Sequence, residues 1–84
     1  MHIAGKIIDL LSVREPEASI CPSEVARALT DGEMAWRAMM PAVRETAAAL
    51  ARSGRIVITQ GDQRIDPNDA YRGPVRLRRG PVFR

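Results

Sequence analysis

The residues best suited to chemistry in this sequence are a single cysteine and a set of arginines. Cys21 directly precedes Pro22 and lies three residues before Glu24, so we expect it at the N-terminus of a helix. A helix dipole stabilises a thiolate there, which would make Cys21 a reactive thiol if it is exposed. The alternative is a structural role, in which this small side chain stands where Ser or Asp usually caps a helix. No second cysteine could resolve an oxidised Cys21, so we favour the structural role.

The rest of the chain holds no catalytic or metal-binding pattern. His2 is the only histidine and stands next to the N-terminus, so histidine-based catalysis and metal binding have no centre. Asp62, Asp66 and Asp69 fall in turn sequences, where Asp usually bonds to the local backbone. A glycine-rich phosphate loop is absent. We therefore expect no enzyme, no cofactor, no metal and no small-molecule ligand.

The arginines give the chain an uneven charge. Residues 1–51 carry five Lys or Arg against seven Asp or Glu, whereas residues 52–84 carry eight Arg against three Asp. A basic C-terminal third favours contact with polyanions, although the total of +3 is modest. The alternative is a solvated arginine surface without a partner. Aromatic residues make up only 4%, so we expect no stacking platform for single strands.

Hydrophobic spacing predicts the elements that position these arginines. Apolar residues recur with a helical period in three segments, and Pro16 separates the first segment from the second. In chain order we expect helices at about residues 2–13, 21–30 and 33–53, with a short edge strand at 18–20. Pro41 lies inside the third segment, so it either kinks the helix or falls in its first turn.

After Gly54 the hydrophobic period changes from helical to strand-like. Arg55–Gln60 and Gln63–Ile65 flank the two-residue turn Gly61-Asp62 and predict a short hairpin. Val75–Arg78 alternates apolar and basic residues, as expected of a half-exposed strand.

The chain length allows one domain, which we expect to span residues 1–84. Its ordered part is expected at about residues 3–79, followed by a loose tail at 80–84 that begins with Gly80-Pro81. There is no 18-residue apolar run and no signal peptide. We therefore expect no membrane contact and a cytoplasmic location, which a single cysteine also suits.

This order of elements is that of a winged helix-turn-helix, an α+β fold that is mainly helical. It predicts three helices and a small antiparallel sheet that forms the wing. The expected core consists of Ile7, Leu10, Leu11, Val25, Leu29, Trp36, Val43, Ala47, Leu50, Ile56, Ile58 and Leu77.

Seven short segments add to this fold prediction: Ile20–Ala26, Trp36-Arg37, Met40-Pro41, Val43-Arg44, Ile58–Gly61, Asp66-Pro67 and Gly73-Pro74. Together they resemble a family of small bacterial winged-helix domains of unknown function, over about residues 7–78. The resemblance implies a winged-helix fold but supplies no activity, ligand or site residue. Winged-helix relatives are mostly DNA-binding proteins, which makes double-stranded DNA the partner we favour by analogy.

Arginines on the third helix, the hairpin and the last strand are the candidate DNA contacts. Arg37 and Arg44 are seven residues apart and share one flank of the helix. Arg76 and Arg78 project from one side of the last strand, and Arg79 extends that patch. The hairpin adds one arginine on a wing that we expect to be short. The predicted set is Arg37, Arg44, Arg52, Arg64, Arg76 and Arg78.

The exposed face of the third helix is expected to lie opposite its core face. Ala38, Pro41, Glu45, Ala48 and Ala49 fall on this face beside the candidate Arg52. Side chains that read base edges, such as Asn, Gln and Ser, are missing from it, and a glutamate repels phosphate. We therefore expect weak, strongly salt-dependent binding with only a slight sequence preference.

The alternative function is a protein-interaction or homodimerisation module without DNA binding. An alanine-rich helix face permits close helix approach, and Met34, Met39 and Met40 offer adaptable apolar contacts. Against this, Ala is simply the best helix former and Met fills thin cores. One contiguous basic surface joining the third helix and the wing would favour DNA, whereas dispersed arginines would favour protein interaction.

Overall fold

The computed structural model describes residues 2–69 and 73–83, which form three helices and a four-stranded antiparallel sheet. The α+β fold class is confirmed, and the arrangement is compatible with a winged helix. The elements are α1 (Ile3–Ser12), β1 (Ser19–Ile20), α2 (Pro22–Leu29), α3 (Glu33–Arg52), β2 (Ile56–Gln60), β3 (Gln63–Ile65) and β4 (Arg76–Arg79).

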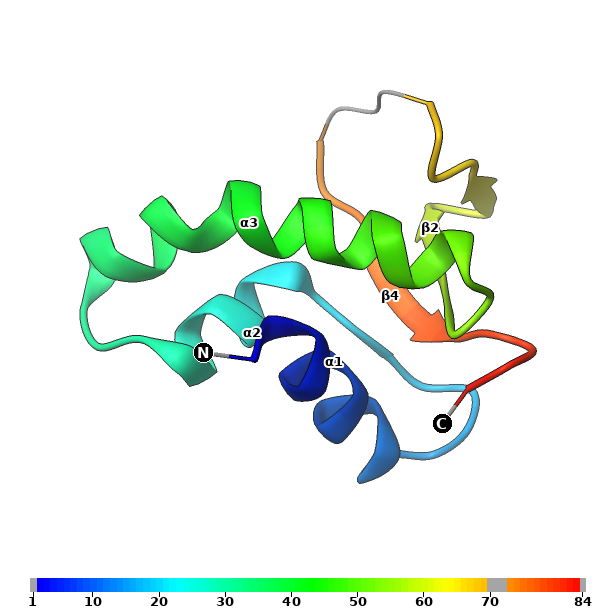
Figure 1. Ribbon diagram of the computed structural model, residues 1–84, viewed down its shortest axis with the longest axis horizontal. Helices are drawn as coiled ribbons and strands as arrows, with labels where there is room; N and C mark the ends of the chain where they lie inside the picture. The colour runs from blue at the N-terminus through cyan, green and yellow to red at the C-terminus, as the bar shows by residue number, and fades with distance from the viewer. Residues whose placement is uncertain (1, 70–72, 84) are drawn as a thin grey trace.

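Helix α3 is the longest element, and the other two helices and strand β2 pack against it. It crosses most of the molecule in Figure 1, with α2 beside its N-terminal half and the sheet beside its C-terminal half. Contacts join α3 to α1, α2 and β2. Pro41 lies inside one continuous helix that begins at Glu33, so it does not fall in the first turn. Its side chain is exposed, so the carbonyl that loses an N–H partner can bond to water.

The sheet has the strand order β1-β4-β2-β3, so the last strand lies between the first and the second. Leu77 of β4 faces Ile20 on one side and Ile58 on the other, and all three side chains are buried. The hairpin around Gly61 forms as predicted, because a glycine accepts the positive φ of 60° there. Residues 66–75 connect β3 to β4.

The predicted core is largely confirmed. Nine of the twelve expected residues are buried, and Leu10, Leu29 and Trp36 are partly buried and packed against them. The core residues that the prediction omitted are Ile20, Ala26, Ala48 and Val75.

Ala48 corrects the expected exposed face of α3. Its relative exposure is only 9%, although the sequence placed it opposite the core. Because α3 packs against both helices and β2, its buried arc is wider than one apolar stripe. Val43 and Leu50 are buried as predicted, so the phase of the helix is right and only the width of its buried side differs.

The C-terminal segment differs from the loose tail that was expected. The Gly80 N–H donates to the Arg55 carbonyl at 2.9 Å, and the Val82 N–H donates to the Gly54 carbonyl at 2.9 Å. A Cβ at position 80 would stand 2.9 Å from the Arg55 carbonyl carbon and would overlap the Gly54 oxygen. Backbone pairing thus continues past β4, and it requires glycine at this close approach. Arg84, the last residue of the expected tail, lies outside the described residues.

We predict that Gly80→Ala lowers the free energy of unfolding by about 1–3 kcal/mol, because a methyl group meets backbone that cannot rotate away. Gly5→Ala is the matched control. Its Cβ would make an ordinary 3.5 Å contact in α1, and alanine should raise stability by about 0.5–1 kcal/mol. Urea unfolding of the two variants tests this, and equal midpoints would refute the close approach.

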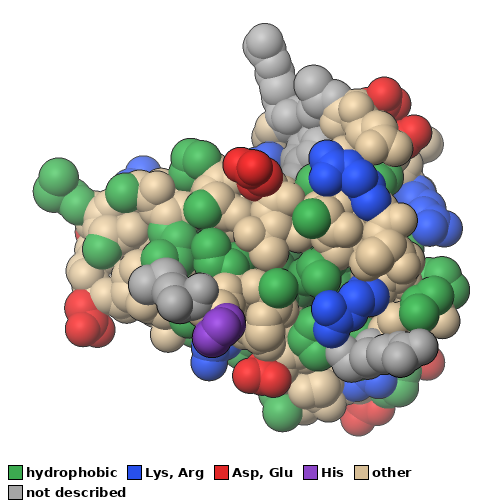
Figure 2. Space-filling view, in the orientation of Figure 1, with side chains coloured by type: hydrophobic (Ala, Val, Ile, Leu, Met, Phe, Trp, Pro, Cys, Tyr) green, Lys and Arg blue, Asp and Glu red, His purple; other side chains and the backbone are tan. Residues whose placement is uncertain are grey.

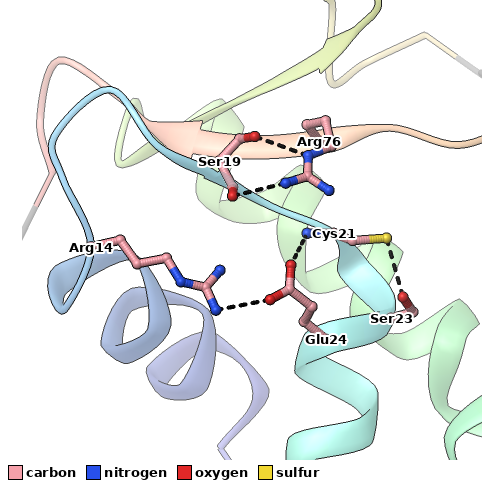
Figure 3. Close-up of polar contacts among 6 residues, drawn as sticks. All are labelled: Arg14, Ser19, Cys21, Ser23, Glu24 and Arg76. Carbon is pink, nitrogen blue, oxygen red and sulfur yellow. Dashed lines mark hydrogen bonds and ion pairs between the residues drawn. The ribbon is translucent and has the colours of Figure 1, made fainter.

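The start of α2 is fixed by a capping box that holds a carboxylate (Figure 3). The Cys21 N–H donates to Glu24 Oε2 at 2.7 Å, and Arg14 Nη2 of the preceding segment lies 2.8 Å from Glu24 Oε1. Burial raises the pKa of the Glu24 carboxyl, but the Cys21 N–H and the Arg14 guanidinium together outweigh it. The pKa is therefore held below its ordinary value of 4.5.

Because the pKa of Glu24 is lower in the folded state than in the unfolded state, the free energy of unfolding depends on pH. The charged Glu24 stabilises the fold above its unfolded pKa, and this contribution is lost as pH falls through the lower folded value. We predict that Glu24→Gln lowers stability at neutral pH and loses less stability than wild type between neutral pH and acid. Unfolding curves at a series of pH values check this. Glu45→Gln, on the exposed face of α3, should change neutral stability by less than about 0.5 kcal/mol. Parallel curves for wild type and Glu24→Gln would contradict the argument.

Candidate nucleic-acid interface

The antiparallel register places three of the candidate arginines on one side of the sheet. Side chains alternate along a strand, so the neighbours of buried Leu77 on β4 project to the side away from the core. Arg76 pairs with Thr59 and Arg78 pairs with Val57, while Thr59 also pairs with Arg64 of β3. We call this side the outer face; it carries Ser19, Val57, Thr59, Arg64, Arg76 and Arg78.

Two of the outer-face guanidinium groups are held in place by neutral acceptors. Arg76 donates from Nε to Ser19 Oγ at 2.9 Å and from Nη2 to the Ser19 carbonyl at 3.0 Å (Figure 3). Arg78 donates from Nη1 to the Glu17 carbonyl at 2.8 Å, with a longer contact of 3.4 Å from Nε to Thr59 Oγ1. These bonds orient the guanidinium groups and leave their full charge in place.

Charge on the outer face is not offset by carboxylates in contact with it. Among the described residues, no Asp or Glu oxygen lies within ion-pair distance of Arg64, Arg76 or Arg78. Glu24 is near enough to Arg76 to interact electrostatically, but its oxygens are taken by Arg14 and by the Cys21 N–H. The outer face is therefore a compact cationic surface.

Arg37 is placed differently, near the start of α3. Its Nη2 lies 2.7 Å from Glu33 Oε2, and the Arg37 guanidinium holds the pKa of the Glu33 carboxyl below its usual value. The Trp36 ring lies near two guanidinium groups, with 4.4 Å from its centroid to Arg27 Cζ and 5.0 Å to Arg37 Cζ. The positive charge of Arg37 is thus partly offset by its own helix.

The two other candidate arginines of α3 contact the connection that follows β3. Arg44 Nη2 donates to the Gly73 carbonyl at 2.9 Å, and Arg52 Nε donates to Asn68 Oδ1 at 3.0 Å. These contacts fasten residues 68 and 73 to the helix from opposite sides of the undescribed residues 70–72. Arg44 and Arg52 therefore have a structural role, in which they hold this connection against α3.

Arg79 does not extend the outer-face patch, contrary to the expectation. It pairs with buried Ile56, so its side chain turns to the helical side of the sheet. Its Nη2 contacts the carbonyl oxygens of Leu11, Ser12 and Arg14 at 3.0, 3.3 and 2.9 Å, and its Cζ lies 4.6 Å from the centroid of the Phe83 ring. Arg79 thus satisfies carbonyls that the end of α1 leaves without helical partners.

The exposed face of α3 carries little that could hold a phosphate or read a base. Ala38, Pro41 and Ala49 are exposed along it, and Glu45 is the acidic residue among them. Near the start of the helix the Met34 side chain is 85% exposed. Figure 2 shows hydrophobic side chains along α3, with Lys and Arg side chains at separate places on this view. The candidate arginines fall into separate groups, with Arg64, Arg76 and Arg78 on the outer face, Arg44 and Arg52 beside the connection after β3, and Arg37 near the start of α3.

Cys21 stands at the start of α2, as the sequence predicted. It is half-buried, and its Sγ accepts a hydrogen bond from Ser23 Oγ at 3.1 Å while its N–H donates to Glu24. The bond from the Cys21 N–H to Glu24 belongs to the helix cap, and the reactivity of the thiol stays a prediction.

Metal, small-ligand and membrane-spanning features are absent from residues 2–69 and 73–83. No group of three or more His, Cys, Asp or Glu side chains in this part of the chain is arranged to hold a metal ion. The same part of the molecule has no pocket for a small ligand. None of its helices combines the length and the apolar character needed to cross a membrane.

Sequence reasoning found the outer-face arginines but missed what orients them. Ser19, Glu17 and Thr59 come from β1, the segment before it and β2, and the separation along the chain hides the contact. The signal for Arg79 was available, because it lies two residues after inward-facing Leu77 and so shares its side of β4.

Comparison with known proteins assigns the chain to a family but not to an activity. No curated protein matches it. A family model described as a protein of unknown function, DUF3253, matches residues 1–80, which is nearly the whole chain, and the protein therefore belongs to this family.

Proposed function

We propose that this protein binds double-stranded DNA through contacts to the phosphate backbone. The observation that carries the proposal is the hydrogen bonding of Arg76 and Arg78, which leaves several of their N–H donors unused by the described residues. A guanidinium has five N–H donors, and each of these two uses two of them on neutral acceptors of the protein. Three N–H groups per arginine therefore remain for a ligand, as far as the described residues are concerned.

Arginine suits this role because its planar fork matches phosphate oxygens and its charge persists at any physiological pH. Desolvating a guanidinium is costly unless an anion compensates it, and on the outer face no protein carboxylate in contact does so, among the residues that the structure describes. The excess of eight Arg over three Asp in residues 52–84 adds a longer-range attraction.

The same surface predicts little sequence discrimination. Base reading requires side chains that reach groove edges with matched donors and acceptors, commonly Asn, Gln or Arg beside one another on a projecting element. The outer face is a short sheet surface whose neutral members are Ser19, Val57 and Thr59. Contacts from it neutralise phosphate, so affinity should follow salt rather than sequence.

A second candidate function is protein interaction through the exposed face of α3. The observation that favours it is the 85% exposure of Met34 together with the exposed Ala38, Pro41 and Ala49. Dispersal of the arginines over several surfaces also fits this alternative. A self-associating chain would show a mass that rises with concentration in the absence of DNA.

We predict that the protein binds unrelated duplexes of equal length with affinities within about threefold of one another at low salt. Three phosphate contacts would give a slope of about −2.7 for log K against log salt concentration. Fluorescence anisotropy with labelled duplexes over a range of salt concentrations measures both quantities. Absence of binding at low salt, or binding that does not weaken with salt, would overturn the proposal.

A further inference from the structure

The described surface offers three places where a duplex could lie, and they differ in charge. The first is the exposed face of α3, the second is the wing tip around β3, and the third is the outer face of the sheet. The place best suited to DNA is the one whose guanidinium groups keep an unshared charge and have the fewest carboxylates beside them.

Helix α3 is poorly suited to receive phosphate. Arg37 is paired with Glu33 at 2.7 Å, and Glu45 adds a negative charge to the exposed face. Arg44 and Arg52 donate hydrogen bonds to Gly73 and Asn68. A phosphate bound there would compete with these contacts, which hold the connection after β3. The remaining exposed residues of this face are apolar and donate no hydrogen bond.

The wing tip is net acidic in its described part. Residues 61–69 contain three aspartates, Asp62, Asp66 and Asp69, against the single Arg64. Their charges repel a phosphate backbone that approaches the tip end-on. Arg64 belongs to the outer face through its pairing with Thr59, and there it is one of three arginines.

On the outer face the three arginines start from backbone positions whose spacing suits one DNA strand. Arg76 and Arg78 are two residues apart on β4, which is about 7 Å, and Arg64 is two strands away, about 10 Å. A stretch of about 10 Å along the duplex axis carries roughly three phosphates of one strand. Thr59 lies between Arg76 and Arg64 in the same cross-strand row and adds a neutral hydroxyl.

From these differences in charge we infer that a bound duplex lies across the outer face of the sheet and that α3 is turned away from the DNA; this inference rests on the proposed function. Helix α3 packs on the inner side through β2, so one duplex segment cannot contact both surfaces. Arg64, Arg76 and Arg78 contact consecutive phosphates of one strand. The helix that a winged-helix arrangement would place in the major groove remains free on the opposite side.

Three double variants that each remove two positive charges test this inference. They are Arg76→Gln/Arg78→Gln on the outer face, Arg44→Gln/Arg52→Gln on α3, and Arg27→Gln/Arg37→Gln on the two sides of the Trp36 ring. Anisotropy with one labelled duplex at low salt gives the affinity, and a salt series gives the slope. The outer-face variant should bind about tenfold or more weakly, with a slope smaller by about 1.8. The other two should change affinity by less than about threefold.

Further variants distinguish the loss of DNA contacts from a loss of binding that is caused by misfolding. Arg76→Lys/Arg78→Lys loses the bonds to Ser19 and Glu17 but keeps both charges, so it should retain most of the affinity. Thr59→Glu places a carboxylate among the three arginines and should weaken binding about tenfold or more, whereas Ala38→Glu on α3 should not. Thermal unfolding shows which variants are folded.

The outcomes distinguish the inference from the proposed function. If Arg44→Gln/Arg52→Gln and Ala38→Glu weaken binding while the outer-face variants do not, DNA binding stands and its placement on the sheet is wrong. If folded wild-type protein binds no duplex at low salt, the proposed function fails and the inference fails with it. If Arg76→Gln/Arg78→Gln and Thr59→Glu alone lose affinity, and the Lys pair keeps it, both hold.

Discussion

The central position of β4 determines how the charged residues of this protein are distributed. Leu77 must face Ile20 and Ile58 to close the core, and this fixes the side on which every other residue of β4 projects. Arg76 and Arg78 therefore lie on the outer face, while Arg79 reaches the end of α1. A shift of one residue in register would bury two arginines and expose the leucine, so the core and the cationic surface depend on the same pairing.

The arginines serve two different purposes, which their partners distinguish. Arg79 uses its Nη2 on carbonyls at the end of α1, and Arg44 and Arg52 contact the connection after β3. Arg76 and Arg78 are also tied to backbone or hydroxyl oxygens, but each retains N–H donors that point to no acceptor among the described residues. Because these guanidinium groups are already held in place, less side-chain entropy is lost when an anion binds. The outer face is therefore preorganised for phosphate.

The hydrophobic periodicity of the sequence was sufficient to predict the helices, the strands and most of the core residues. The helical phase of α3 followed from Val43 and Leu50, and the alternation in β4 followed from Leu77 between two arginines. The position of β4 between β1 and β2 could not be read from the sequence, because it depends on pairing between segments far apart in the chain. For the same reason the partners of the arginines, and the pairing of Gly80 with Arg55, appear only in the folded molecule.

Amide and guanidinium resonances of the labelled protein provide the most direct test of where a duplex lies. In a titration with a duplex at low salt, proton–nitrogen correlation spectra report each backbone N–H and each arginine Nε separately. We expect the largest shifts at Val57 and Thr59 and at the Nε groups of Arg76 and Arg78, with Ala38 and the rest of the exposed face of α3 nearly unchanged. Shifts concentrated on α3, with the outer face unaffected, would contradict this account.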